Sequence, residues 1–146
     1  MQNLSTTHRD EIRDMGEIAL PAGNAKTSFV DLRDLGAVTA QALTDASHEN
    51  KKYTLTGAEA LDYYAVARKL SAVLERPIRY LRPSVLTFIR RQLAQGRKLG
   101  YVLVLTMLYT ITRFGNAKTV SNDVERILGR PPISFDQFAK DYRDCW

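Results

Sequence analysis

The chain has 146 residues, of which 45% are hydrophobic and 25% are charged, and its formal net charge is +5. This length and composition are typical of one globular domain with its own hydrophobic core, and they exclude a disordered, fibrous or disulfide-stapled protein. The single cysteine, Cys145, excludes an intrachain disulfide and fits a cytoplasmic location. We therefore expect residues 1–146 to form a single unit.

The first predicted elements alternate between helix and strand. A short polar helix is expected over Leu4–Met15, ended by Gly16, and short strands are expected over Glu17–Pro21 and Ser28–Val30. Asp31 precedes an apolar repeat at helical spacing, so its carboxylate is predicted to cap the first amides of a helix. This alternation is typical of the α/β class.

The middle of the chain continues the alternation. Lys51–Gly57 has the pattern of a strand, and Thr56 and Glu59 after it have the spacing of a capping box. The capping box predicts a helix whose apolar stripe runs over Tyr63–Leu74. The alternation over Ile78–Pro83 predicts one more short strand.

The second half of the sequence is helical. Two helices are expected to fill Ser84–Arg113, divided near Gly96–Gly100, and a third is expected to begin at Ser121 and to end at Gly129. A last helix is predicted to begin at Ser134. The predicted fold class is therefore α/β, with short strands in the first half and a mostly helical second half.

The strongest apolar run is LGYVLVLTMLYTIT, at Leu99–Thr112. Its 14 residues are fewer than the roughly 20 that a membrane-spanning helix needs, so we expect a buried or interface helix and no membrane span. Only basic charges occur between Arg76 and Lys118. A solvated face is the favoured interpretation of this block, and nucleic-acid or anionic-surface binding is the least favoured alternative because no recognition motif accompanies it.

The five letters GNAKT occur twice, at Gly23–Thr27 and at Gly115–Thr119. A phosphate-binding P-loop needs the pattern G-x-x-x-x-G-K-[ST], and a Rossmann loop needs G-x-G-x-x-G. Neither pattern occurs in the chain. A turn at Gly23 and Asn24 is therefore favoured over a phosphate loop. The second copy has different flanks, so we interpret the repeat as a coincidence.

No catalytic or metal-binding constellation is visible in the sequence. The two histidines, His8 and His48, have none of the spacings of metal ligands. Tyr64 is followed four residues later by Arg68, where the Tyr-x-x-x-Lys motif of short-chain reductases requires lysine. The residues by themselves therefore predict neither a metal site nor a catalytic group.

Several stretches nevertheless resemble the C-terminal half of NmrA-like atypical short-chain dehydrogenase/reductases, a family of the NAD(P)-binding Rossmann superfamily. They are MQNL, LPAGNAKTSFVDLRDLGAVTAQAL, HENKKYTLTGAEALDYYAVARKLSAVLERPIRY and VERILGRPPISFDQFAKDYRDCW. The resemblance covers nearly the whole chain and is weaker over Ser84–Val120. It implies an incomplete Rossmann-like unit that lacks the glycine-rich, dinucleotide-binding N-terminal half.

The resemblance also implies candidate site residues. In the family, the segment that matches Asn3 lies near the nicotinamide, so Asn3 is a candidate for cofactor binding. The loop Gly23–Phe29 would lie beside the substrate pocket, which makes Lys26, Thr27 and Ser28 candidates for substrate binding. NAD(P) is the implied cofactor, although we do not expect this chain to bind it alone.

Two functions are compatible with this resemblance. The first is a C-terminal fragment or truncated form of an NAD(P)-dependent oxidoreductase or epimerase-like protein that is not catalytic alone. The second is a non-catalytic binding or redox-sensing regulatory module that acts through a protein partner. Because half of a doubly wound sheet leaves an apolar face open, we expect self-association or association with a missing N-terminal half.

Overall fold

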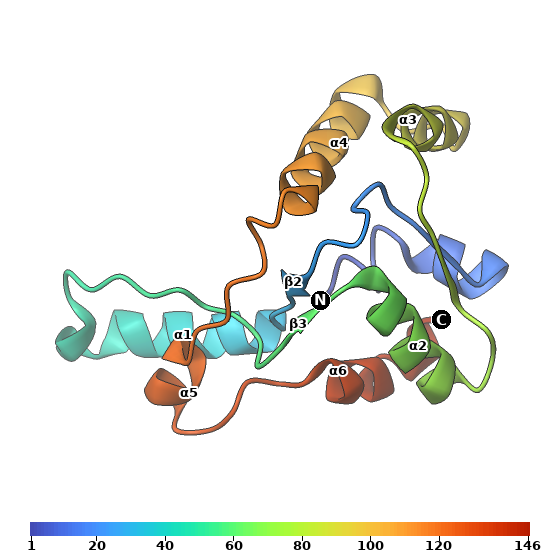
Figure 1. Ribbon diagram of the computed structural model, residues 1–146. Helices are drawn as coiled ribbons and strands as arrows, with labels where there is room; N and C mark the ends of the chain where they lie inside the picture. Colours follow the sequence, from blue (N-terminus) through green and yellow to red (C-terminus); the bar gives the residue numbers. More distant parts are fainter.

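The computed structural model describes all 146 residues and contains two small sheets among six α-helices (Figure 1). In the first sheet, β1 (Glu17–Ala19) pairs in parallel with β4 (Arg79–Leu81). In the second, β2 (Thr27–Ser28) pairs antiparallel with β3 (Ala60–Leu61). A parallel pair in which the strands are separated by helices is the hallmark of an α/β fold, so the predicted class is confirmed.

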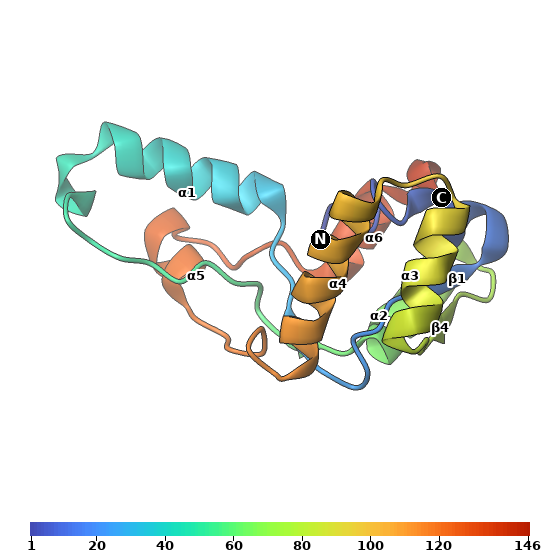
Figure 2. The same ribbon diagram turned by 90° about the horizontal axis from the view of Figure 1, so that it is seen from above.

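The helices form three pairs. They are α1 (Leu32–Thr44), α2 (Tyr63–Leu74), α3 (Val85–Ala94), α4 (Leu99–Arg113), α5 (Asp123–Leu128) and α6 (Phe135–Asp141). Short π- and 3₁₀-helices are η1 (Glu11–Met15), η2 (Ala46–His48) and η3 (Arg143–Cys145). Helix α3 packs on α4 and α2 packs on α6, whereas α1 lies with α5 and extends away from the sheets (Figure 2). None of the helices combines the length and the hydropathy that crossing a bilayer requires.

Several predicted helix ends are confirmed by their hydrogen bonds. The Asp31 carboxylate accepts a bond of 2.8 Å from the amide of Arg33, at the start of α1. The Ser134 hydroxyl accepts one of 3.1 Å from the amide of Gln137, at the start of α6. Gly129 ends α5 with a φ of 66°, a left-handed conformation that glycine adopts without steric cost.

The predicted strand over Lys51–Gly57 is wrong. The segment returns from the far end of α1 toward the centre of the molecule, and no strand pairs with it (Figure 1). It is held instead by side chains near α5, where the amide of Thr54 donates to the Asp123 carboxylate at 2.8 Å. The alternating pattern of side chains therefore indicated an extended segment, but no neighbouring strand pairs with it.

The predicted capping box at Thr56 and Glu59 is also wrong. Helix α2 begins at Tyr63, and the Asp62 carboxylate caps it by accepting a bond of 2.7 Å from the amide of Ala65. The hydroxyl of Thr56 instead donates to the carbonyl oxygen of Ser121 at 3.2 Å. The predicted helix over Leu4–Met15 is shorter than expected, because turns precede η1.

The main hydrophobic core lies between the β1–β4 sheet, η1, α2 and α6, and it extends to α3 and α4. Its fully buried side chains include Ile12, Leu20, Leu70 and Phe138. Phe88 of α3 is fully buried as well, and its ring meets that of Tyr109 edge to face, with the centroids 5.8 Å apart. This contact joins α4 to α3.

Candidate functional site

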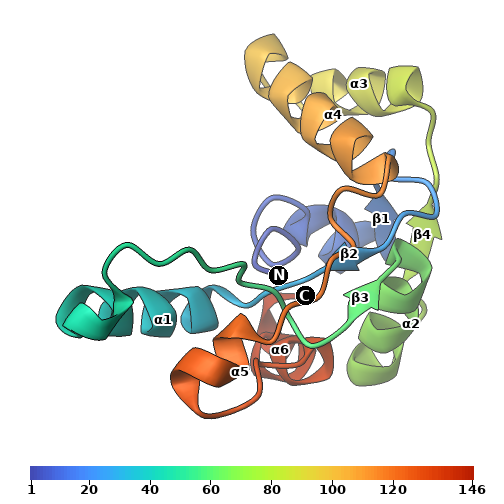
Figure 3. The same ribbon diagram turned by 60° about the vertical axis from the view of Figure 1, so that its left-hand side comes forward.

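A cleft of about 280 Å³ lies where the N-terminal segment, β2, the start of α2 and one side of α4 meet. Figure 3 shows β2 and the N-terminus near the end of α4 that leads toward α5. Most of the lining is apolar and comes from Met1, Leu4, Leu20, Phe29, Val30, Tyr63, Leu105, Leu108 and Tyr109. The polar lining comes from Asn3, His8, Thr27, Ser28 and Thr112. An apolar cleft with a few convergent polar groups is typical of a small-molecule site.

Three of the four predicted site residues line this cleft. Asn3 is an exposed residue of the lining, and Thr27 and Ser28 form β2. Lys26 differs from the expectation, because its side chain is exposed and does not line the cleft. The binding roles of these four residues stay predictions.

The two hydroxyl groups of β2 have different hydrogen bonding. The Ser28 hydroxyl donates to the carbonyl oxygen of Ala117 at 3.1 Å, and the Ser28 amide donates to the same oxygen at 2.8 Å. The Thr27 hydroxyl is buried and has no partner within the chain. Because a buried polar group without a hydrogen bond is costly, Thr27 is the lining residue best suited to bond with a ligand.

A row of buried side chains reaches the cleft from the side of α3. The Tyr109 hydroxyl lies 2.5 Å from Nε2 of His8, and Nδ1 of His8 lies 3.6 Å from a carboxylate oxygen of Glu11. The other oxygen of Glu11 accepts a bond of 3.0 Å from Gln95 and lies 3.2 Å from Nε of Arg91. We call Glu11, His8 and Tyr109 the acid–histidine–tyrosine row.

The surroundings of this row set its protonation. Burial alone would raise the pKa of Glu11, but its contacts with His8 and Gln95 and the charge of Arg91 outweigh burial and lower the pKa. Burial, assisted by Tyr101 and Glu11, raises the pKa of the Tyr109 hydroxyl well above its usual value. The row therefore holds an ionised carboxylate at one end and a neutral phenol at the other at neutral pH.

The sequence did not predict the acid–histidine–tyrosine row. His8 and Glu11 are three residues apart, which is the only signal in the sequence, and Tyr109 follows 101 residues after His8. The apolar pattern of Leu99–Thr112 marks Tyr109 as one more buried aromatic residue. Only the packing of α4 over the N-terminal segment brings the three side chains together.

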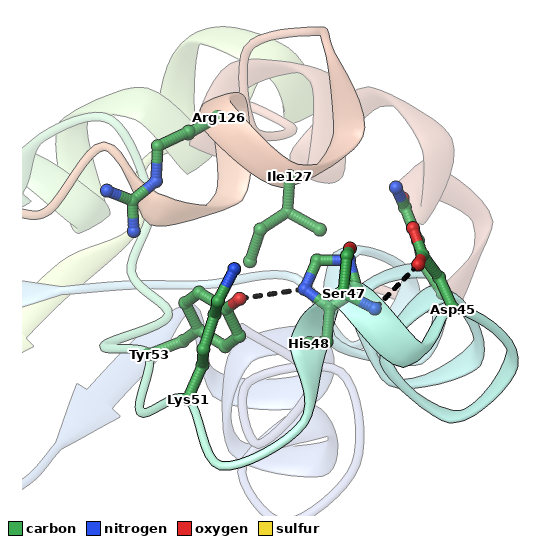
Figure 4. Close-up of a pocket in the computed structure, with 8 residues that line it drawn as sticks. Asp45, Ser47, His48, Lys51, Tyr53, Arg126 and Ile127 are labelled. Atoms are coloured by element: carbon green, nitrogen blue, oxygen red, sulfur yellow. Dashed lines mark hydrogen bonds between the residues drawn. The ribbon is translucent and has the colours of Figure 1, made fainter.

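A second cavity, of about 500 Å³, lies between η2 and α5, on the other arm of the molecule (Figure 4). In it, the Tyr53 hydroxyl lies 2.7 Å from Nδ1 of His48, and the Asp45 carboxylate accepts a bond from the Ser47 amide. The Arg126 guanidinium is already paired with Asp123. This cavity is larger but strongly polar and open, and no buried side chain in it lacks a partner, so the cleft beside β2 is the better candidate site.

The basic block contributes partly to internal structure. Arg91 pairs with Glu17 at 2.7 Å, and Arg76 and Arg97 donate to backbone carbonyl oxygens of the N-terminal segment at 2.9 and 2.7 Å. No group of three or more His, Cys, Asp or Glu side chains is arranged to hold a metal ion.

The structure supports the predicted turn at the first GNAKT. Gly23 has a φ of 65°, and the Ala25 amide donates to the carbonyl oxygen of Ala22 at 3.3 Å. The carbonyl oxygen of Gly23 accepts a bond from the Tyr80 hydroxyl at 3.1 Å. The turn leads into β2 and not into the N-terminus of a helix, so it lacks the arrangement that cradles a phosphate.

Comparison with known proteins relates the chain to NAD(P)-dependent reductases. No model of a known protein family matches the chain. The NAD(P)H azoreductase of Xenophilus azovorans is 36% identical to it over 140 residues, which are 96% of this chain and 49% of that protein. The chain corresponds to the C-terminal half of a family of NAD(P)-binding reductases. It spans about half the length of the curated relatives that it matches.

Solved structures confirm the incomplete Rossmann-like fold. The NADPH-dependent quinone oxidoreductase QOR2 of Escherichia coli superposes with a TM-score of 0.87 at 19% identity, over 95% of this chain and 50% of that one. The triphenylmethane reductase of Citrobacter sp., solved with NADP(H), superposes with a TM-score of 0.83 at 22% identity, over 90% of this chain and 47% of that one. The predicted resemblance to NmrA-like reductases is confirmed, and these similarities give no support to the regulatory alternative.

The residues of the cleft would suit the nicotinamide ring of such a cofactor but not its phosphates. Asn3 offers an exposed amide at the cleft, and the Thr27 hydroxyl offers a buried hydrogen-bonding group without a partner. The apolar walls suit the flat face of a ring. The phosphates would need a glycine-rich loop before a helix, and neither GNAKT segment has that form.

Proposed function

We propose that the chain is the substrate-side half of an NAD(P)-dependent oxidoreductase that reduces flat, conjugated acceptors such as quinones or azo compounds. The observation that carries this proposal is the apolar cleft, which has the unpartnered hydroxyl of Thr27 in its wall. The azoreductase, quinone oxidoreductase and triphenylmethane reductase names of the similar proteins support the same class of acceptor.

The residues of the cleft have separate tasks in this function. Leu105 and Leu108 of α4 provide apolar contacts that bind a flat acceptor and exclude water. The Thr27 hydroxyl donates a hydrogen bond to the carbonyl oxygen or azo nitrogen of the acceptor. Asn3 holds the nicotinamide at the cleft, and the bound cofactor supplies the hydride. Lys26, which is exposed next to β2, would contact only an acidic substituent that extends out of the cleft.

We propose further that the chain by itself neither binds the whole dinucleotide nor turns over with NAD(P)H. The two GNAKT segments do not form a phosphate site, and the relatives that use NAD(P)H are twice as long. Residues 1–146 would act as one unit that is completed by a nucleotide-binding half. A cytoplasmic location, expected from the single cysteine, stays a prediction.

A chimera tests this function. The nucleotide-binding half of the Xenophilus azovorans azoreductase is fused in front of this chain, and NADPH oxidation is followed with 1,4-naphthoquinone or an azo dye as acceptor. We expect turnover by the chimera, and none by either half alone. Tight, saturable binding of NADPH to the 146-residue chain would contradict the need for a second half, and an inactive but folded chimera would contradict the assigned reaction.

We also propose that the isolated chain self-associates through α4. One side of this helix lines the cleft, whereas Leu103, Val104, Met107 and Ile111 on the other side are about half exposed. Residues at this spacing form a continuous apolar stripe. We expect a second copy of the chain to cover this stripe. Two copies related by a two-fold axis can pack the same apolar stripe against each other.

A further inference from the structure

The acid–histidine–tyrosine row ends at the cleft, and its use in reduction rests on the proposed function. His8 and Glu11 are 1% and 4% exposed, and Tyr109 lines the cleft with 8% of its surface exposed. Burying three ionisable groups in a row is costly unless each has a partner. Reduction of a conjugated acceptor needs a proton as well as a hydride. Of the two phenols in the lining, Tyr63 and Tyr109, only the hydroxyl of Tyr109 contacts a second ionisable side chain, His8.

We propose that Tyr109 donates the proton to the acceptor, and that His8 and Glu11 are positioning residues that return a proton to Tyr109. Tyr109 is the group in contact with the acceptor. His8 acts through Tyr109, and Glu11 acts through His8. No motif of the sequence carries this assignment, because the row is assembled from the N-terminal segment and α4.

The proton passes from His8 through Tyr109 to the acceptor as the hydride arrives. The acceptor gains a hydride, with both its electrons, from a dihydronicotinamide. The Oη–H bond of Tyr109 breaks, and its proton bonds to the oxygen or nitrogen at the other end of the reduced bond. The Tyr109 oxygen takes the proton on Nε2 of a doubly protonated His8, across the contact of 2.5 Å. His8 is left neutral with its Nδ1–H toward Glu11, and solvent restores the second proton.

The surroundings suit each step of this transfer. Burial opposes a free phenolate at Tyr109, so the loss of its proton must be coupled to proton transfer from His8. Arg91 and Gln95 hold Glu11 in its ionised form beside the imidazole. The gap of 3.6 Å between Nδ1 of His8 and Glu11 is longer than a hydrogen bond, and both atoms lack other partners, so a small shift completes the row.

The pH dependence of the transfer involves every ionisable group near the row. These groups are Glu11 of η1, Tyr63 of α2, Arg91 of α3, Arg97 between α3 and α4, and Tyr101 of α4. The pKa of Glu11 is lowered and those of Tyr63 and Arg91 are raised, so these three groups keep one charge state around neutral pH. We therefore expect the transfer to depend on the proton that His8 passes to Tyr109 across their contact.

The 146-residue chain allows a direct test with 1-benzyl-1,4-dihydronicotinamide, a hydride donor that has no phosphates, and 1,4-naphthoquinone as acceptor. We expect the chain to raise the rate of quinone reduction, and Tyr109→Phe to lower that increase about a hundredfold, the scale of general acid catalysis. The dissociation constant of the quinone should stay unchanged. The solvent deuterium isotope effect on the rate should disappear in the same variant.

Matched variants separate the transfer from folding. Tyr64→Phe removes a hydroxyl that does not line the cleft, and it should keep the rate of the parent chain. His8→Gln can still donate a hydrogen bond to Tyr109 but cannot pass a proton on, so it should lower the rate and the solvent deuterium isotope effect while quinone binding is kept. Circular dichroism verifies that each variant is folded.

Nitrogen NMR of His8 provides a readout that does not need turnover. Over the pH range in which the chain raises the rate, both ring nitrogens should carry protons, and Glu11→Gln should favour a singly protonated ring at the same pH. A ring with unprotonated Nε2 throughout that range would overturn the proposal. So would a Tyr109→Phe variant that binds the quinone and keeps the parent rate and isotope effect. A folded chain that binds no quinone would contradict the proposed function as well, and this outcome is distinct from the other two.

Discussion

The hydroxyl of Ser28 donates to the carbonyl oxygen of Ala117 at 3.1 Å, and this bond joins the two GNAKT segments of the chain. Ser28 directly follows the first segment, and Ala117 lies within the second. The Ser28 amide donates to the same oxygen at 2.8 Å, so the loop after α4 runs beside β2 on the edge opposite β3. The wall of the cleft at Thr27 is therefore bonded to β3 on one edge of β2 and to the loop after α4 on the other.

Thr27 and Ser28 should respond differently to loss of their hydroxyl groups. Thr27→Val removes a hydroxyl without a partner and should leave the free energy of unfolding unchanged within about 0.5 kcal/mol, while it weakens quinone binding several-fold. Ser28→Ala removes one bond to Ala117 and should cost about 1 kcal/mol of stability. Urea unfolding and quinone titration measure the two effects. Equal effects of both variants on binding would count against the role of Thr27.

Gly57 should not tolerate a side chain. A Cβ atom at this position would lie 2.0 Å from the carbonyl oxygen of Phe29, which lines the cleft. Gly57→Ala must move the backbone after β2, and we expect a loss of about 2 to 3 kcal/mol in the free energy of unfolding. Gly36→Ala is the matched control, because nothing lies within 4 Å of its Cβ position and a helical alanine should be neutral or stabilising. Urea denaturation of the two variants tests the difference.

Asp31 should contribute to stability only above acidic pH. Burial would raise the pKa of Asp31, but hydrogen bonds from the Arg33 side chain, the Arg33 amide and Gln2 outweigh it and lower the pKa. A lowered pKa gives stability that is present above the unfolded value of about 3.9 and is lost as pH falls through the folded value. Asp31→Asn keeps a good cap but should show a shallower loss of stability below about pH 4. Unchanged acid unfolding in this variant would show that Asp31 is not the group responsible.

Alkaline pH should destabilise the chain through buried tyrosines. Burial raises the pKa of Tyr80 to about 12, and burial also raises the pKa values of Tyr63 and Tyr109. Because the unfolded groups ionise near pH 10, stability is full below that pH and declines as pH rises toward the folded pKa values. Absorbance at 295 nm should show these three of the seven tyrosines ionising only as the chain unfolds. Ionisation of all seven in the folded chain near pH 10 would contradict this.

The exposed stripe of α4 should control self-association. Leu103→Glu combined with Met107→Glu places charges on residues that are 51% and 54% exposed, so the fold should persist while the chain becomes a monomer. Leu43→Glu on α1 is a control, because Leu43 is 82% exposed and lies away from α4. Light scattering at micromolar concentration measures the mass of each variant. A monomeric parent chain would rule out this interface.

The sequence by itself determined the local structure of most helices and the resemblance to NmrA-like reductases. Caps such as Asp31 and Ser134 and the glycine stop at Gly129 are local effects, because the bonded groups lie within a few residues. Local patterning also predicted β1 and β4. It was wrong at Lys51–Gly57, where an extended segment has the right pattern but finds no partner strand, since pairing is decided by distant parts of the chain.

Only the tertiary structure decided the candidate site. Asn3, Thr27 and Ser28 were predicted from the family resemblance, but their meeting at one cleft depends on α4 lying over the N-terminal segment. The same packing brings Tyr109 to His8 across 101 residues and Ala117 to Ser28 across 89. Such contacts have no signature in the sequence, because each residue has ordinary neighbours, and the free energy that joins them comes from burying apolar faces of distant elements.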